Sequence, residues 1–126
     1  MKFTTDKKEQ YAVLKLEEDN LNSTVAPSLK SEFIFLNQEG IANLIFDMSA
    51  VKFVDSSGLS AILTAHRLFK ANGCFVISGP LQPMVTKLIE ISRLDSILTI
   101  VPTQSEAVDY AMMDAIQRDL DSGEDA

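Results

Sequence analysis

Residues 42–77, ANLIFDMSAVKFVDSSGLSAILTAHRLFKANGCFVI, decide the fold class of this protein. Two short apolar runs, 42–47 and 74–77, have the length and the polar flanks of buried strands. Between them, apolar residues recur at helical spacing from Leu59 to the Asn-Gly pair at 72–73, a typical helix end. A strand, a helix and a second strand in this order predict a right-handed βαβ unit with parallel strands.

The alternation of strands and helices continues upstream of this unit. Residues 2–5 and 11–16 predict two strands of an antiparallel hairpin, and the polar segment 17–22 predicts a loop. We expect a helix from about Ser23, because the apolar residues that follow fall on one face at spacings of four and three. Gly40 is expected to end this helix.

Downstream, we expect a helix from about Gln82, a last strand over 97–101 and a final helix after the T-x-x-E capping box at 103–106. The fold class is therefore α/β: a single domain with a mostly parallel β-sheet, an antiparallel N-terminal hairpin strand and about four α-helices. The domain is expected to span 1–118, and the acidic tail 119–126 is predicted to be disordered.

Composition and charge argue against several functions. The chain has 11 Lys and Arg against 18 Asp and Glu, a formal net charge of -7, and no basic patch to attract nucleic acid or an anionic membrane. No window approaches the ~18 apolar residues of a membrane span, and the first ten residues contain no apolar signal segment. The single cysteine suits a reducing compartment. We expect a cytoplasmic protein that binds no nucleic acid and does not insert into a membrane.

Catalytic, cofactor and metal motifs are missing from the sequence. The five glycines are too scattered for a phosphate-binding loop, and one histidine with one cysteine cannot supply a usual metal cluster. His66 follows Ser56 by ten residues, a rise of ~15 Å along a helix, so the two cannot form a catalytic pair. We predict no enzyme activity, no cofactor and no metal. His66 and Cys74 are interpreted as core residues, and Met84, Met112 and Met113 as core and interface filler.

The segment Asp55-Ser56-Ser57-Gly58 permits two interpretations. Asp and Ser are favoured helix caps, and the glycine could simply give clearance at a tight turn. Alternatively, a serine at a helix N-terminus, after a parallel strand, stands where α/β proteins place their binding surfaces.

A longer stretch around this segment resembles a known family. Residues 47–59, DMSAVKFVDSSGL, closely resemble the D-x-S-x-V-x-F-x-D-S-S-G-L segment of STAS domains, specifically those of the bacterial anti-sigma factor antagonists. The order of the expected elements matches that family over about residues 2 to 117.

The resemblance implies a function and a set of residues. Ser56 would be phosphorylated by a partner that is both anti-sigma factor and serine kinase, and a PP2C-type phosphatase would reverse the modification. Asp55, Ser57, Gly58 and Leu59 would be the neighbouring partner contacts. In the loop where the family commonly has G-E-L-D, this chain has Asp19-Asn20-Leu21-Asn22, and Asn22 is the partner contact expected there.

The sequence leaves two alternatives to this function. The chain could be a stand-alone STAS subunit that docks, without phosphorylation, onto a membrane transport complex or a signalling assembly. A serine hydrolase would need a base that the sequence does not place near Ser56.

Overall fold

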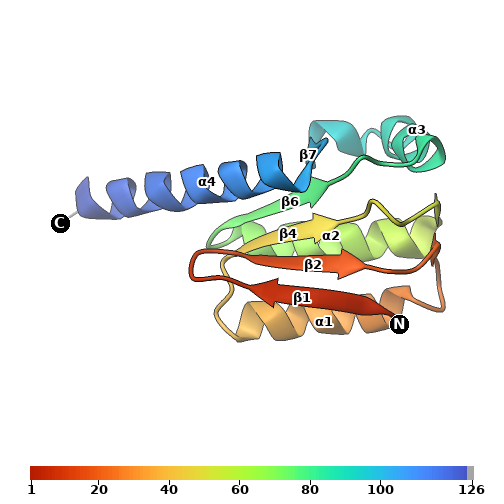
Figure 1. Ribbon diagram of the computed structural model, residues 1–126, viewed down its shortest axis with the longest axis horizontal. Coiled ribbons are helices and arrows are strands. Elements are labelled where there is room, and N and C mark those ends of the chain that lie inside the picture. The colour runs from red at the N-terminus through yellow and green to blue at the C-terminus, as the bar shows by residue number, and fades with distance from the viewer. Residues whose placement is uncertain (125–126) are drawn as a thin grey trace.

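The computed structural model describes residues 1–124 of the chain (Figure 1). In chain order its elements are β1 (Phe3–Lys7), β2 (Ala12–Leu16), β3 (Asn20–Leu21), α1 (Ala26–Gln38), β4 (Asn43–Asp47), β5 (Phe53–Val54), α2 (Ser56–Lys70), β6 (Cys74–Ser78), α3 (Pro83–Ile91), the short 3-10 helix η1 (Leu94–Ser96), β7 (Thr99–Val101) and α4 (Gln104–Glu124).

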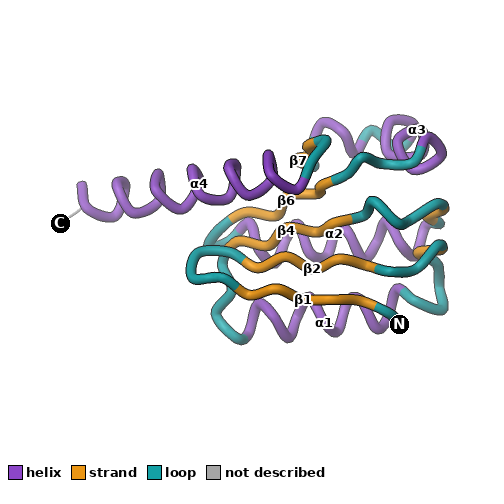
Figure 2. The backbone as a smooth tube through the Cα atoms, viewed as in Figure 1, coloured by secondary structure: helices purple, strands orange, loops and turns teal. Residues whose placement is uncertain are grey.

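Five of the strands form one sheet in the order β1-β2-β4-β6-β7. Strand β1 pairs with β2 in antiparallel fashion, and the other neighbours in this sheet pair in parallel. Helices α1 and α2 cover one face, and α4 crosses the other (Figures 1 and 2). The predicted α/β class, parallel sheet and N-terminal hairpin are confirmed.

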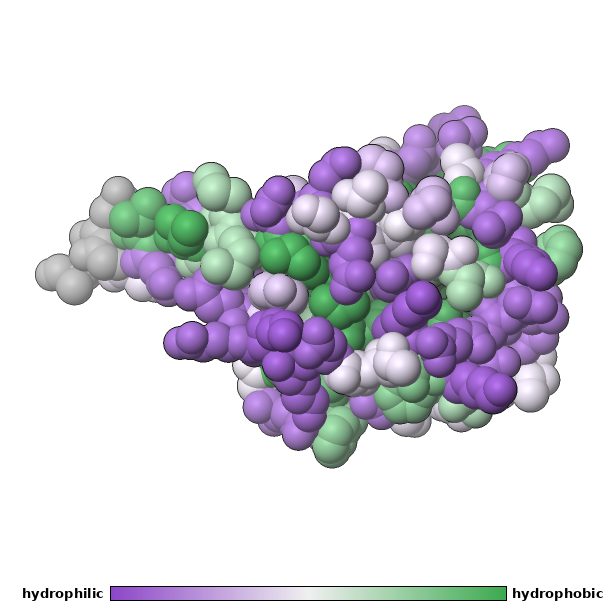
Figure 3. Space-filling view, in the orientation of Figure 1, coloured by the Kyte–Doolittle hydropathy of each residue, from purple (hydrophilic) through white to green (hydrophobic). Residues whose placement is uncertain are grey.

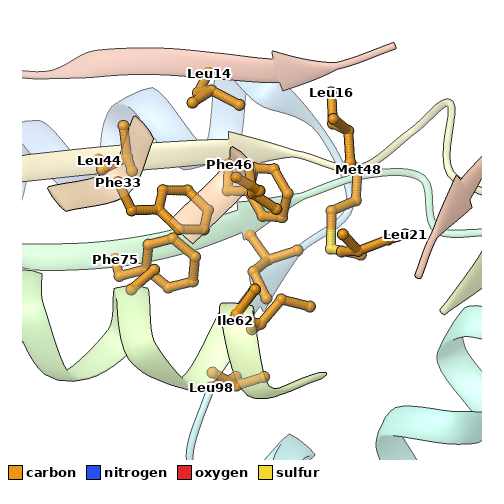
Figure 4. Close-up of a cluster of buried hydrophobic side chains, with 14 of the residues drawn as sticks. Leu14, Leu16, Leu21, Phe33, Leu44, Phe46, Met48, Ile62, Phe75 and Leu98 are labelled. Carbon is orange, nitrogen blue, oxygen red and sulfur yellow. The ribbon is translucent and has the colours of Figure 1, made fainter. Parts of the chain in front are cut away.

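The larger core lies between the sheet and helices α1 and α2. Its centre is aromatic: the ring of Phe33 in α1 meets Phe46 and Phe75 edge to face, at centroid distances of 5.2 and 5.8 Å (Figure 4). Such pairs prefer this geometry because the positive ring edge faces the negative ring face. The aromatic cluster therefore joins α1 to the two central strands.

A smaller core fills the other face of the sheet, where Val13, Ile45 and Val76 meet Ala107 and Ala111 of α4. The two alanines are fully buried. Their small side chains let the first half of α4 lie close to the sheet.

Two boundaries and one additional strand differ from the sequence-based expectations. Helix α1 begins at Ala26, because residues 23–25 form a turn before it. Strand β7 begins at Thr99, because the chain before it is still turning after η1. The loop expected over 17–22 contains β3, which pairs in parallel with β5 as a small second sheet.

The acidic tail is a correction. We expected disorder from Asp119, whereas α4 continues to Glu124, and residues 125 and 126 lie outside the described range. Side-chain pairs one turn apart support this continuation: Arg118 with Asp114, and Gln117 with Asp121.

Candidate functional site

Ser56 is the first residue of α2, at the end of the sheet where the parallel strands finish (Figure 1). The residue before it, Asp55, has an extended backbone and caps the helix: its Oδ1 accepts a hydrogen bond from the Gly58 N–H at 3.0 Å. This cap satisfies one of the free N–H groups of the first turn. The prediction that Asp55 is a helix cap is confirmed.

The start of α2 is held by the loop that precedes α1. The Lys52 and Phe53 N–H groups donate to the Asp19 carbonyl at 2.7 and 3.1 Å, and the Asp55 N–H donates to the Leu21 carbonyl at 3.2 Å. Together with the β3–β5 pairing, these bonds fix residues 19–22 against residues 52–55. Segments more than thirty positions apart in the sequence thus form one surface.

Gly58 lies beneath this surface and is buried. A Cβ at this position would lie 2.5 Å from the Leu21 carbonyl oxygen and 2.7 Å from the Val54 Cγ1 atom. Glycine is therefore required for the close approach of α2 to β3. Gly58 shapes the site and presents no side chain to a partner.

Ser56 is exposed and Ser57 half-buried, and both line a shallow groove between the starts of α1 and α2. The opposite wall of the groove is Ser23, Ala26, Pro27 and Lys30. The Lys30 ammonium donates to the Ser60 hydroxyl at 3.1 Å, one turn beyond Ser56. A cation therefore lies in the same groove as the serine.

Asn22 holds the other loop of the site. Its side-chain oxygen accepts from the Thr24 and Val25 N–H groups, at 3.0 and 3.3 Å. This is an Asx-type turn that leads the chain into α1. Asn22 thus orders the turn before α1, while the N-cap position of that helix is Val25, which makes no side-chain cap.

Phe53 and Lys30 were not named from the sequence as site residues. Phe53 is 55% exposed although it lies in strand β5. Leu59, which was named, is half-buried and packs at the edge of the core. In the sequence, Phe53 belongs to an apolar strand pattern, which predicts a buried side chain. Its exposure three residues before α2 is therefore visible only in the structure.

Neither His66 nor Cys74 lies near Ser56: His66 is ten residues further along α2, and Cys74 is the first residue of β6. His66 is in the third turn of α2, half-buried, and burial together with Lys70 and Arg67 lowers its pKa. Burial raises the pKa of the Cys74 thiol to about 12.

No cluster of three or more metal-ligating side chains occurs within residues 1–124, and no helix of this part of the chain is long and apolar enough to cross a membrane.

The fold and the site together describe a small α/β domain with a mostly parallel sheet. An exposed serine at a capped helix start lies on its surface, where the strands end. The chain belongs to the STAS domain family, whose model matches residues 2–107.

Solved structures of other proteins share this fold. An anti-sigma factor antagonist from Mycobacterium paratuberculosis has a TM-score of 0.80 at 19% identity, over 88% of this chain and 93% of that one. The Bacillus cell fate determinant SpoIIAA in its phosphorylated form has a TM-score of 0.66 at 20% identity, over 86% and 98%. The murine anion transporter Slc26a9 has a TM-score of 0.69 at 18% identity, over 86% of this chain and 18% of the transporter.

Proposed function

We propose that this protein is an anti-sigma factor antagonist of the bacterial cytoplasm that regulates transcription by partner switching. Its unmodified form binds an anti-sigma factor that is also a serine kinase. Phosphorylation of Ser56 releases that partner, and a PP2C-type phosphatase restores the binding form. The match to the STAS family model and the likeness to antagonists, one of them solved in a phosphorylated form, support the proposal.

The observation that carries the proposal is the exposure of Ser56 at a helix start that is already capped by Asp55. Among the described residues, none donates to or accepts from the Ser56 hydroxyl. A phosphate can therefore be added without the loss of a hydrogen bond of the fold. The proposed contact surface is Asn22, Asp55, Ser57 and Leu59, with Gly58 beneath it.

The charges around Ser56 explain how one modification can spare the fold and still release a partner. A phosphate adds about -1.5 to -2 charges, which a helix N-terminus stabilises by ~0.3–1 kcal/mol. Lys30, in the same groove, adds to this stabilisation. At a docked interface the same charge lies beside Asp55 and must be desolvated, at a cost of several kcal/mol. A cost of ~2 kcal/mol weakens binding about 30-fold.

The first test is phosphorylation. The protein is incubated with ATP and a purified candidate kinase of the anti-sigma factor type from the same genome, and the product is mapped by mass spectrometry. We expect one phosphate on Ser56, its loss in Ser56→Ala, and its retention in the matched neighbour Ser57→Ala. Modification of Ser57 in place of Ser56 would contradict the proposal.

The second test is the affinity of each form for that kinase, measured by calorimetry. The Ser56→Ala variant is expected to bind like the unmodified protein, and the phosphorylated protein at least ~30-fold more weakly. Ser56→Asp should also bind more weakly. Equal binding by the modified and unmodified forms would overturn the switch.

The second candidate is a docking subunit of a membrane transport complex or signalling assembly that works without phosphorylation. It is favoured only by the occurrence of this fold within the Slc26a9 transporter. In that case Ser56→Asp would bind its partner as tightly as the unmodified chain, and no kinase would modify Ser56. The two tests above therefore separate the candidates.

A further inference from the structure

The groove that contains Ser56 has one charged side chain among the described residues that line it, and this is Lys30. The other lining residues are Ala26, Pro27 and the four serines Ser23, Ser56, Ser57 and Ser60. Lys30 is half-buried, and the ion pairs found within residues 1–124 do not include it. A positive charge therefore lies among hydroxyl groups, with no carboxylate paired to it.

The ammonium of Lys30 is bound to a neutral group. Its Nζ atom donates to the Ser60 hydroxyl at 3.1 Å. Ser60 is exposed, so water can take over this hydrogen bond. A lysine ammonium is a compact charge on a flexible four-carbon stem with three rotatable donors. Lys30 can therefore exchange the Ser60 hydroxyl for a nearby anion.

Ser56 places such an anion within reach once it is phosphorylated. Residues four apart on a helix are neighbours on one face, with their Cβ atoms ~5–6 Å apart, and Ser56 and Ser60 have this spacing. The Cα–Cβ bonds of a helix tilt toward its N-terminus, so the Ser60 side chain leans toward the turn of Ser56. A phosphate on Ser56 thus enters the groove in which the ammonium already lies.

The neighbouring elements direct no second cation into this groove. The first two turns of α2 carry no charged residue after its cap, Asp55. In the loop beside β3 and β5, Lys52 is paired with Asp19 at 3.8 Å. Helix α3 packs against β5, but its charged residues Lys87 and Glu90 are not among the residues that line the groove.

We propose that Lys30 is the positioning residue for a phosphate on Ser56. On phosphorylation its ammonium leaves the Ser60 hydroxyl and pairs with the phosphate, which links α1 to α2 across the groove. The exchange is favourable because an anion attracts the ammonium more strongly than a neutral hydroxyl does. The inference rests on the proposed function, since it takes Ser56 as the phosphorylated residue.

Pairing with Lys30 sets the charge of this phosphate near neutral pH. A phosphoserine loses its second proton with a pKa of about 6. A cation beside the phosphate favours the dianion and lowers this pKa, whereas the Asp55 carboxylate opposes the effect. At this end of the molecule the face seen in Figure 3 carries mainly hydrophilic residues, so the pair stays in contact with water and the shift is moderate. Lys30 therefore keeps both negative charges on the phosphate at slightly acidic pH, and the proposed release of the partner persists there.

The test is a pH titration by phosphorus NMR on the full chain, with phosphoserine encoded at position 56 during translation. Lys30→Met should raise the phosphate pKa by ~0.5, as expected for the loss of one partly exposed ion pair. Lys30→Arg keeps the charge and should leave the pKa within ~0.2 of the parent protein. Lys70→Met is the matched control, because it removes the same charge from the far end of α2, beyond the screening length, and should shift the pKa by less than ~0.2. Circular dichroism verifies that each variant is folded.

Ser60→Ala separates the ammonium from the hydroxyl. It should leave the phosphate pKa unchanged or lower, because the ammonium loses its competing partner. A rise as large as in Lys30→Met would overturn the proposal, since the hydroxyl would then hold the phosphate. A Lys30→Met pKa equal to that of the Lys70→Met control would also overturn it.

The result does not depend on finding the kinase, because the phosphoserine is encoded. Failure of the kinase to modify Ser56 would count against the proposed function, whereas a raised pKa in Lys30→Met would still support the role of Lys30. Modification of Ser56 by the kinase, together with an unchanged pKa in Lys30→Met, would overturn the role of Lys30 alone.

Discussion

At position 58 a hydrogen atom stands where every other amino acid has a Cβ, and the space beyond it is filled by the backbone of β3. The nearest atom to a Cβ there is a carbonyl oxygen, at 2.5 Å, which cannot move without the strand. The close contact of α2 with the loop before α1 therefore depends on one residue.

We predict that Gly58→Ala destabilises the fold by ~1–3 kcal/mol, the usual cost of overpacking, in spite of the better helix propensity of alanine. Urea unfolding monitored by circular dichroism measures this. Ser57→Ala, one position earlier in the same turn, is the control and should change stability by no more than ~0.5 kcal/mol. A Gly58→Ala variant as stable as the wild type would show that β3 can shift to make room for the added methyl group at little cost.

The thiol of Cys74 gives a second prediction at this scale. Burial raises its pKa to about 12, with a further increase from Asp114 and an opposing effect from Arg118, against an ordinary value of 9.0. At pH 8 the native thiolate fraction is then roughly a thousandfold below that of the unfolded chain. Because the folded-state pKa is the higher one, the stability contributed by the neutral thiol is complete below pH 9. It is lost as the pH rises from about 9 to 12.

We expect Cys74 to react with an aromatic disulfide reagent at pH 8 only as fast as the protein unfolds. The measurement compares the rate in buffer with the rate in denaturing urea. A Cys74→Ala, Ser105→Cys variant provides an exposed thiol as control, since Ser105 is exposed in the first turn of α4. Rapid reaction of native Cys74 would contradict the inferred burial.

Among the elements, α4 is the one whose second half has least support from the rest of the fold. Arg118 fastens it: the guanidinium donates to the Gly73 carbonyl at 2.6 Å and to the Asp114 carboxylate at 2.8 Å. The first bond ties α4 to the turn after α2, and the second is a surface pair of small value.

We predict that Arg118→Ala leaves global stability within ~1 kcal/mol of the wild type but speeds amide exchange about 5- to 10-fold over residues 114–122. Hydrogen exchange followed by mass spectrometry on dilute protein measures this. Gln117→Ala is the control, because within residues 1–124 the Gln117 side chain pairs only with Asp121 of its own helix. Equal exchange in the two variants would mean that the contact with Gly73 does not hold the helix.

The elements also show which local patterns are reliable. The helix α2 begins at its expected cap, and the T-x-x-E sequence starts α4 with the Thr103 hydroxyl accepting from the Glu106 N–H at 3.1 Å. The tail from Asp119 differs from its expectation, because its polar composition predicts disorder whereas the structure continues α4 to Glu124. Pairs four residues apart stabilise an acidic helix that composition alone does not reveal.

For the whole molecule, the aromatic cluster is the principal link between layers. Phe33 is fully buried and contacts rings from β4 and β6 (Figure 4). We predict that Phe33→Ala costs ~3–5 kcal/mol, measured by urea unfolding, because it leaves a cavity between α1 and the sheet. Phe35, two positions later on the same helix, is 51% exposed. Phe35→Ala should cost less than ~1 kcal/mol, and a similar loss in both variants would contradict this division of the helix.

The sequence by itself determined the α/β class, the parallel sheet and the place of Ser56 at a helix start. These features depend on neighbours within a few positions: an apolar run between turns, a cap, an apolar repeat. Only the tertiary structure decided that β3 pairs with β5, that Lys30 lines the same groove as Ser56, and which face of α4 the sheet leaves uncovered. Such contacts join segments that are distant in the chain or depend on what the sheet leaves uncovered, and no local pattern encodes either.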